Sequence, residues 1–291
     1  MCGTSASPGR DPASSRHASV VFSTDQEWAG HLVAFVRAGL EQGEQVQYFA
    51  DTTDPDRVLR TLDDGDVDTA SAVRRGQLIV TTAAQTYLAG PRFDPDAMIG
   101  LWEEAVETAL ARGHPGLRAI GEMSWCARET AGADRLLEYE LRIHQEVFER
   151  LPLTAWCFYD DRLLPRDDLA VLVGAHPTRL GAAVPADGGT GLRVTPTTDF
   201  PGFRLSGPAG YESRRVTASV AAALPGSRAA QVTLDLSDLQ FMDVDALTAL
   251  ARAAAGRNLD TPVRLLDPPP SLKRMLELFP ELGSALEVVG R

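Results

Sequence analysis

Residues 19–50 read SVVFSTDQEWAGHLVAFVRAGLEQGEQVQYFA, and this stretch decides the fold of the first half of the chain. Its first five residues form a β-branched and aromatic run that is typical of a strand. Thr24 and Glu27 have the spacing of a capping box, which predicts that a helix begins there. Apolar side chains then follow one helical face as far as Leu40, Gly43 ends the helix, and residues 45–50 form a second strand-like run. These signals predict a strand–helix–strand unit.

The same alternation continues along the first half of the chain. Further strands are predicted at residues 78–81, 117–121 and 154–159. The helices between them include two that start at Asp-Pro pairs, Asp54-Pro55 and Asp94-Pro95, where aspartate caps and proline fits the first turn. Five strands separated by helices predict an α/β fold with a doubly wound parallel sheet covered on both faces.

The composition changes after residue 180. Residues 181–202 are rich in proline and glycine and have no periodicity, which is typical of a linker. A smaller unit follows, with strands predicted at residues 203–206, 231–236, 263–266 and 286–289. The predicted organisation is therefore a disordered leader at 1–16, a first domain at 17–180, a linker at 181–201 and a small α/β sandwich at 202–291.

Charge and composition exclude several classes of protein. The chain has 291 residues, of which 28 are basic and 40 acidic, and its net charge is −12. Without a basic stripe, direct binding of nucleic acid is not expected. No apolar run reaches the ~18 residues of a membrane helix, and the N-terminal segment has no apolar stretch typical of a secretion signal. We therefore expect a cytoplasmic protein with no membrane partner.

The scarcity of lysine and cysteine limits the chemistry further. Lys273 is the single lysine, so a P-loop lysine or a Schiff base in the first half is excluded. Cys2, Cys126 and Cys157 are too few and too scattered for a disulfide framework or a four-ligand zinc site. We expect inert core packing for Cys126 and Cys157, with a redox-sensing pair as the alternative. No metal and no cofactor is expected.

Residues 234–247 read LDLSDLQFMDVDAL and carry the most specific pattern of the second half. The segment resembles the core motif of the STAS domain, which occurs in anti-sigma factor antagonists and in sulfate transporter tails. The agreeing residues are Asp235, Leu236, Ser237, Phe241, Met242, Asp243 and Leu247. The family's pair of hydroxyl residues is replaced by Val244 and Asp245, and its glycine by Ala246.

The STAS resemblance implies partner switching, in which an anti-sigma factor kinase phosphorylates the second hydroxyl residue. Asp245 places a permanent negative charge at that position, near a helix N-terminus that favours it. We therefore predict a partner-switch loop of Ser237, Asp243, Val244 and Asp245 that is not phosphorylated at the usual position. The expected partners are an anti-sigma factor or serine kinase, or other STAS proteins. The alternative is that Asp243 and Asp245 are only helix caps.

Several short blocks of the first half resemble the MEDS family, a sensory domain of methanogen and methylotroph regulators. The blocks include AGLEQGE at 38–44, FDPD at 93–96, LRAIGEMSW at 117–125, CFY at 157–159 and HP at 176–177. The resemblance covers residues from about 17 to 180. It implies a RecA-like α/β fold and a sensory role toward small molecules. The turn after the first strand has neither a glycine-rich loop nor Lys-Ser/Thr, so ATP hydrolysis is not expected.

A ligand pocket is predicted beyond the fourth strand, because ligands of open parallel sheets bind at the carboxyl ends of strands. Its candidate residues are Arg118, Glu122, Met123, Trp125, Tyr139 and Glu140, with Glu122 or Glu140 as the polar anchor. The alternative is structural, with Trp125 in the core and Glu122 paired with an arginine. His144 is expected in the core and His176 in a turn.

No catalytic arrangement stands out, so the chain is not expected to be an enzyme. These observations predict a two-domain signalling protein whose sensory domain controls a STAS-like output domain. The alternative is a small-molecule-binding or enzymatic module whose STAS-like part only mediates oligomerisation. Residual nucleotide binding in the sheet cleft is a third, weaker alternative.

Overall fold

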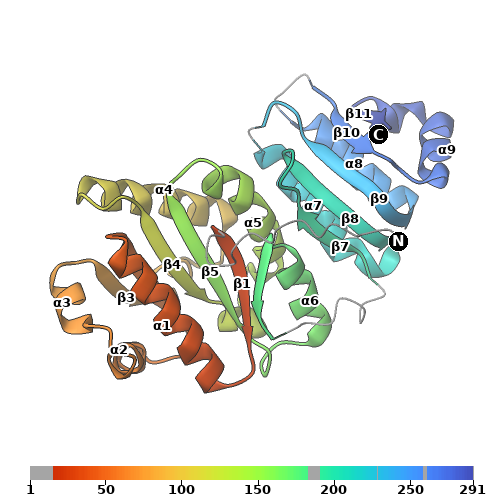
Figure 1. The fold of residues 1–291 in the computed structure, drawn as a ribbon. Helices are drawn as coiled ribbons and strands as arrows, with labels where there is room; N and C mark the ends of the chain where they lie inside the picture. The colour runs from red at the N-terminus through yellow and green to blue at the C-terminus, as the bar shows by residue number, and fades with distance from the viewer. Residues whose placement is uncertain (1–15, 183–190, 228, 258–260, 291) are drawn as a thin grey trace, which may run out of the picture.

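The chain folds into two α/β units, each built on one sheet (Figure 1). The computed structural model describes residues 16–182, 191–227, 229–257 and 261–290. Nearly all of the predicted leader and residues 183–190 of the predicted linker lie outside the described residues. Within the described ranges, no helix is both long and apolar enough to cross a bilayer.

The first unit is built on a six-stranded sheet in the order β3-β2-β4-β5-β1-β6, in which every strand pairing is parallel. Its elements are β1 (His17–Phe22), α1 (Asp25–Glu41), β2 (Gln45–Ala50), α2 (Pro55–Asp64), α3 (Thr69–Arg74), β3 (Leu78–Thr82), α4 (Pro95–Ala111), β4 (Leu117–Glu122), α5 (Leu136–Ile143), β5 (Leu153–Asp160), α6 (Arg166–Gly174) and β6 (Thr178–Gly181). The predicted α/β fold with a parallel sheet is confirmed. The RecA-like arrangement stays a prediction.

Helices cover both faces of this sheet, as predicted (Figure 1). The core under α1 to α3 contains Trp28, Leu32 and Phe35, packed on side chains of β1 and β2. The opposite face is covered by α4, α5 and α6. The capping box that predicts the start of α1 is present, since the Thr24 side chain accepts from the Glu27 backbone and Glu27 reaches back to Thr24.

Two features of the first unit differ from the sequence prediction. A sixth strand, β6, pairs with β1 at the sheet edge, and its four residues are too short a run to show a period. The helix predicted for residues 133–150 is divided into a 3-10 turn (Ala133–Arg135), α5 and a π-helical turn (His144–Phe148). Gly132, in the left-handed region at φ 83°, precedes this segment.

The second unit has a mixed sheet in the order β11-β10-β9-β8-β7, with only β7 antiparallel. Its elements are β7 (Arg193–Pro196), β8 (Gly202–Ala209), α7 (Arg214–Gly226), β9 (Thr233–Met242), α8 (Val244–Ala255), β10 (Val263–Leu266), α9 (Pro270–Leu278) and β11 (Leu286–Val289). Strand β7 is formed by residues that the sequence assigns to the linker. Strand β9 extends six residues beyond the predicted end at 236.

One of the two hydrophobic clusters of the structure, the one under α4, α5 and α6, continues into the second unit. Buried side chains of α5 and its π-helical turn belong to the same cluster as Phe203 and Leu224 of the second unit. The Gln145 side chain donates to the Gly202 carbonyl at 3.3 Å and accepts from the Ser227 hydroxyl at 2.9 Å. The end of α5 and α7 therefore form the interface between the units.

Candidate functional site

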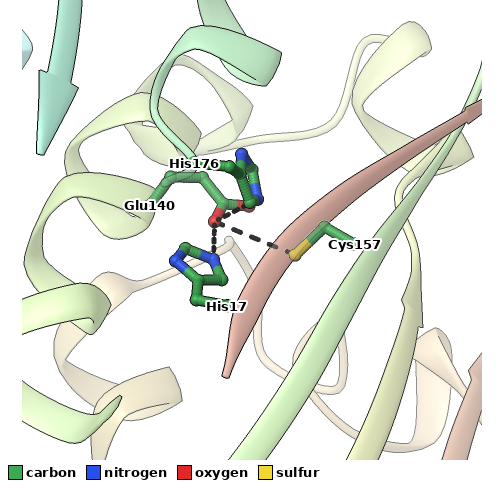
Figure 2. Close-up of side chains that lie close together, drawn as sticks. All are labelled: His17, Glu140, Cys157 and His176. Carbon is green, nitrogen blue, oxygen red and sulfur yellow. Dashed lines mark hydrogen bonds and ion pairs between the residues drawn. The ribbon is translucent and has the colours of Figure 1, made fainter. Parts of the chain in front are cut away.

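A buried carboxylate, Glu140, lies between the side chains of His17, Cys157 and His176 in the first unit (Figure 2). Its Oε2 atom is 3.3 Å from Nε2 of His17 and 3.3 Å from Nε2 of His176. The Cys157 thiol lies 3.9 Å from the same oxygen. The Tyr159 hydroxyl donates to the other oxygen, Oε1, at 3.2 Å. We call His17, Glu140, Cys157 and His176 the Glu140 cluster.

Four separate elements place these residues. His17 begins β1, and Cys157 lies in the neighbouring β5, where Ala155 pairs with His17 and Cys157 with Ser19. Because successive strand residues alternate between faces, the side chains of His17 and Cys157 point to the same face of the sheet. Glu140 comes from α5, which covers that face, and His176 follows α6. The His176 Nδ1 atom bonds to the Leu172 carbonyl at 2.9 Å, which directs Nε2 toward Glu140.

The Glu140 cluster is almost completely removed from water. The side chains of His17, Glu140 and His176 are exposed by 1%, 0% and 0%. Burial, with the neighbouring His176, lowers the pKa of His17 to about 3, although Glu140 opposes this. Burial also tends to raise the pKa of Glu140, but His176 and His17 outweigh it and hold that pKa below its usual range. At neutral pH the cluster therefore contains an ionised carboxylate and a neutral His17.

The thiol and the phenol of the site stay protonated. Burial, reinforced by the Glu140 charge, raises the pKa of Cys157 well above its ordinary value and does the same for Tyr159. Cys126 is also a free cysteine, and burial raises its pKa to about 12. The thiolate is the reactive form of a cysteine, so a redox-sensing cysteine needs a low pKa. The pKa values of Cys126 and Cys157 are both raised, and neither thiol therefore has this property.

A small cavity of about 30 Å³ adjoins the Glu140 cluster and is lined mainly by aromatic and sulfur-containing side chains. His17 and Cys157 belong to its wall, together with Met123 and Tyr139. The Trp102 indole donates to the Tyr139 hydroxyl at 2.7 Å, so the polar tip of Tyr139 is already occupied. The cavity can hold two or three waters, since each needs roughly 10–15 Å³.

A family comparison matches this part of the chain. The model of the MEDS family, described as the methanogen/methylotroph, DcmR sensory domain, matches residues 16–177. The chain belongs to the MEDS family. The matched MEDS segment contains all four residues of the Glu140 cluster, with His17 and His176 each one residue inside its limits. The prediction of a MEDS sensory domain in the first half of the chain is confirmed.

A transcriptional repressor and a helicase are among the proteins to which this chain is similar. The transcriptional repressor DcmR of Methylorubrum extorquens is 25% identical over 173 residues, which cover 58% of this chain and 60% of the repressor. The match thus spans less than two thirds of that repressor. The structure of the DUF1998 helicase MrfA bound to DNA and AMPPNP covers 94% of this chain and 39% of its own at 12% identity. Its TM-score of 0.31 is too low to support a common fold or function.

The structure brings three of the predicted pocket residues together in the MEDS segment. Met123 and Tyr139 line the cavity, and Glu140 lies beside it. Trp125 is fully buried and packs against Phe93, with ring centroids 4.8 Å apart and the ring planes tilted by 37°. Its position is that of a core side chain.

The other two predicted pocket residues are bound elsewhere. Glu122 accepts from the backbone of Asp51 and from the Thr53 hydroxyl, so it holds the loop after β2. Arg118 lies near the start of β4, where its guanidinium donates to Glu44 at 2.5 Å. That contact is at the amino end of the strand, away from the predicted pocket at the carboxyl end.

Sequence reasoning did not select His17, Cys157 or His176 as site residues. The sequence places His176 in a turn, and it does lie in a bend after α6, but its side chain is fully buried against Glu140. His144, which the sequence places in the core, is half-buried near His17, with ring centroids 6.0 Å apart. A usable signal was present, since His17, His144 and His176 flank or lie within apolar segments, where a buried polar ring needs a partner.

The second unit presents the predicted partner-switch residues at the start of α8. Asp243 caps the helix by accepting from the Ala246 backbone at 2.7 Å. The Asp245 side chain is 71% exposed and forms an ion pair with Arg214 at 2.6 Å. Val244 is also exposed. The Ser237 hydroxyl, in β9, donates to Asp235 at 2.7 Å.

Proposed function

We propose that this chain is a regulatory sensory protein whose MEDS segment binds a small molecule at the cavity beside Glu140. The family description and the similarity to a transcriptional repressor support a sensory, regulatory role. The cavity supports small-molecule binding, since apolar and aromatic walls with a few polar groups are typical of ligand sites. The RecA-like arrangement implied by the MEDS resemblance belongs to the same proposal, and the parallel six-stranded sheet supports it.

The observation that carries the proposal is the position of α5 between the site and the second unit. Glu140 projects from α5 into the cluster, and Gln145, five residues later, forms two hydrogen bonds with the second unit. A π-helical turn lies at this junction, and such turns are frequent at functional sites. Because the cavity is small, a ligand larger than about three waters must displace its lining, which includes Tyr139 of α5. We infer that this displacement reaches α7.

For the second unit we propose a STAS-like output that docks a partner protein. The carrying feature is an exposed patch at the start of α8, formed by Tyr211, Phe241, Val244 and Asp245, which we call the α8 patch. Arg214 lies over the Tyr211 ring at 4.7 Å and pairs with Asp245. Aromatic and aliphatic side chains beside a fixed charge are typical of protein interfaces. The proposed partners are an anti-sigma factor kinase or another STAS protein, as the resemblance implies.

Native mass spectrometry of the purified full chain tests the sensory half of this proposal. We expect a small molecule that leaves on denaturation, and we expect Gly121→Ala to lose it. Gly121 lines the cavity, and an added methyl group would meet only the Met123 sulfur at 3.5 Å. Gly100→Ala in α4, where nothing lies within 4 Å, is the matched control. Retention of the molecule by both variants would place it outside the cavity.

Binding to purified anti-sigma factor kinases and STAS proteins tests the output half. We expect the wild-type chain to bind one of them and Asp245→Arg to bind it at least about tenfold more weakly, because the variant reverses a charge at the centre of the α8 patch. Glu277→Arg, an exposed charge reversal on α9, is the control. Self-association without any such partner would favour the alternative, in which the second unit only mediates oligomerisation.

A further inference from the structure

We propose that the Glu140 cluster is a binding site for a divalent transition-metal ion of the zinc class. Its four residues offer two imidazole nitrogens, one thiol sulfur and one carboxylate oxygen, and these atoms all lie within 4.8 Å of one another. Imidazole and thiolate ligands together favour zinc-class ions over magnesium or calcium, which prefer oxygen ligands. The sequence alone indicates no metal, because no two of these residues lie close together in it.

The distances around Glu140 suit tetrahedral coordination. With bonds of about 2.0–2.3 Å, neighbouring ligand atoms of a tetrahedral zinc ion are roughly 3.3–3.6 Å apart. Glu140 Oε2 is 3.3 Å from each histidine Nε2 and 3.9 Å from the Cys157 sulfur. No two donor atoms are more than 4.8 Å apart, so the most distant pair must approach by only about 1 Å to reach the spacing of a tetrahedral site.

The neighbours of the cluster leave the required donor atoms directed inward. His176 uses Nδ1 to bond the Leu172 carbonyl, which orients Nε2 as outer partners do in metal sites. Tyr159 donates to Glu140 Oε1, so Oε2 is the oxygen turned toward the histidines and the thiol. Figure 2 shows His17, His176 and Cys157 converging on this oxygen from different elements.

The charge of the cluster also calls for a cation. Glu140 is completely buried, and among the described residues the basic side chains within 4 Å of its carboxylate are histidines, without arginine or lysine. Buried carboxylates are normally paired with a cation or coordinate a metal. A divalent ion supplies positive charge here, and on binding it displaces the proton of the Cys157 thiol to solvent, so that the thiolate becomes its ligand.

The proposed metal site lies beside the cavity, so a bound ion could contact a ligand there and also stabilise the first unit. His17 and Cys157 belong both to the cluster and to the cavity wall, so an ion held by them lies at the edge of the cavity. The ion also ties β1, β5, α5 and the segment after α6 together, and it fixes the helix that contacts the second unit. The metal site itself does not depend on the proposed sensory function.

Cobalt titration of the metal-free full chain tests the site. We expect about one equivalent of Co²⁺ to bind with a thiolate-to-cobalt charge-transfer band and intense visible bands of a tetrahedral ion. Zn²⁺ should displace the cobalt and bleach these bands. Absence of a charge-transfer band, or weak bands of a six-coordinate ion, would overturn the proposal. This measurement uses the wild-type protein and so does not depend on the folding of a variant.

Variants identify the ligands. Cys157→Ser should abolish the charge-transfer band, and His176→Gln should weaken cobalt binding at least about tenfold. Cys126→Ser and His114→Gln are matched controls, because neither residue belongs to the cluster, and both should bind cobalt as the wild type does. Circular dichroism shows whether each variant is folded. Equal cobalt spectra for Cys157→Ser and Cys126→Ser would show that the cluster is not the binding site.

Discussion

The imidazole rings of His17 and His176 lie with their centroids 4.3 Å apart, although the two residues are at opposite ends of the MEDS segment. Each ring presents Nε2 to the same oxygen of Glu140. The first strand and the segment after α6 are thus connected through a residue of α5. His17, Glu140 and His176 therefore belong to the candidate site and also hold the two ends of the MEDS segment together.

Removal of the Glu140 carboxylate tests this connection. We expect Glu140→Ala to lower the free energy of unfolding of the metal-free protein by about 3 kcal/mol, because it leaves buried polar partners unpaired. Glu140→Gln should cost clearly less, since its amide oxygen can still accept from Tyr159. Urea unfolding in the presence of a chelator measures both values. Equal losses would mean that the Tyr159 hydrogen bond has no part in the stability.

Xenon binding should report whether the cavity is accessible, because xenon enters small apolar cavities. We expect a xenon-induced shift of methyl resonances around Met123 in the wild type and in Gly100→Ala, and none in Gly121→Ala, whose methyl group occupies the space. Nuclear magnetic resonance under xenon pressure measures this. A response of Gly121→Ala equal to that of the wild type would place the xenon site elsewhere.

The shared core predicts cooperative unfolding of the two units. We expect the wild type to unfold in one transition and Gln145→Ala to unfold in two, since this variant removes both hydrogen bonds of Gln145 to the second unit and leaves the buried Ser227 hydroxyl without its acceptor, at a cost of about 1–3 kcal/mol. Gln231→Ala also loses two hydrogen bonds, but inside the second unit, and should keep one transition. Fluorescence and circular dichroism followed in urea make the comparison. Two transitions in both variants would contradict a specific role of Gln145.

The exposed ion pair of Asp245 should contribute little to stability. We expect Asp245→Ala to change the free energy of unfolding by less than about 1 kcal/mol, because Arg214 and Asp245 both face water. Thermal unfolding measures the change. A larger loss would show that the residue has a structural role, and Asp245 variants could then no longer be used as clean tests of partner binding.

The Ser237–Asp235 hydrogen bond predicts a dependence of stability on pH. Burial tends to raise the pKa of Asp235, but hydrogen bonds from Ser237 and the nearby Arg204 outweigh it, so that the pKa lies below 3.8. The folded state therefore binds fewer protons than the unfolded state, and this stability is present above pH 3.8 and is lost as the pH falls further.

Ser237→Ala should remove part of this stabilisation. We expect a loss of about 1 kcal/mol at pH 7 that becomes smaller toward pH 3, because the protonated carboxyl no longer gains from the hydroxyl. Urea unfolding at several pH values measures the difference between the two proteins. A difference independent of pH would mean that Ser237 acts through packing and not through the charge of Asp235.

Much of the fold was determined by the sequence itself. The capping box at Thr24 and Glu27, the Asp-Pro starts of α2 and α4 and the β-branched runs of the strands are local signals, because a helix start or an alternating strand depends on residues a few positions apart. The MEDS blocks also lie in the sequence. The prediction was poorer for β6 and β7, where short strands are formed only because a neighbouring strand is present.

The site was decided by the tertiary structure. Glu140 and the cavity residues Met123 and Tyr139 could be selected because they lie near the end of a strand or on one helix. His17, Cys157 and His176 could not, since the order of strands in the sheet brings β1 beside β5 and the chain after α6 back to them. Arg118 lies at the amino end of β4, away from the carboxyl end where the pocket was predicted, and pairs there with Glu44. Sequence periodicity records which face of an element is buried, whereas contacts between distant elements depend on how the sheet is assembled.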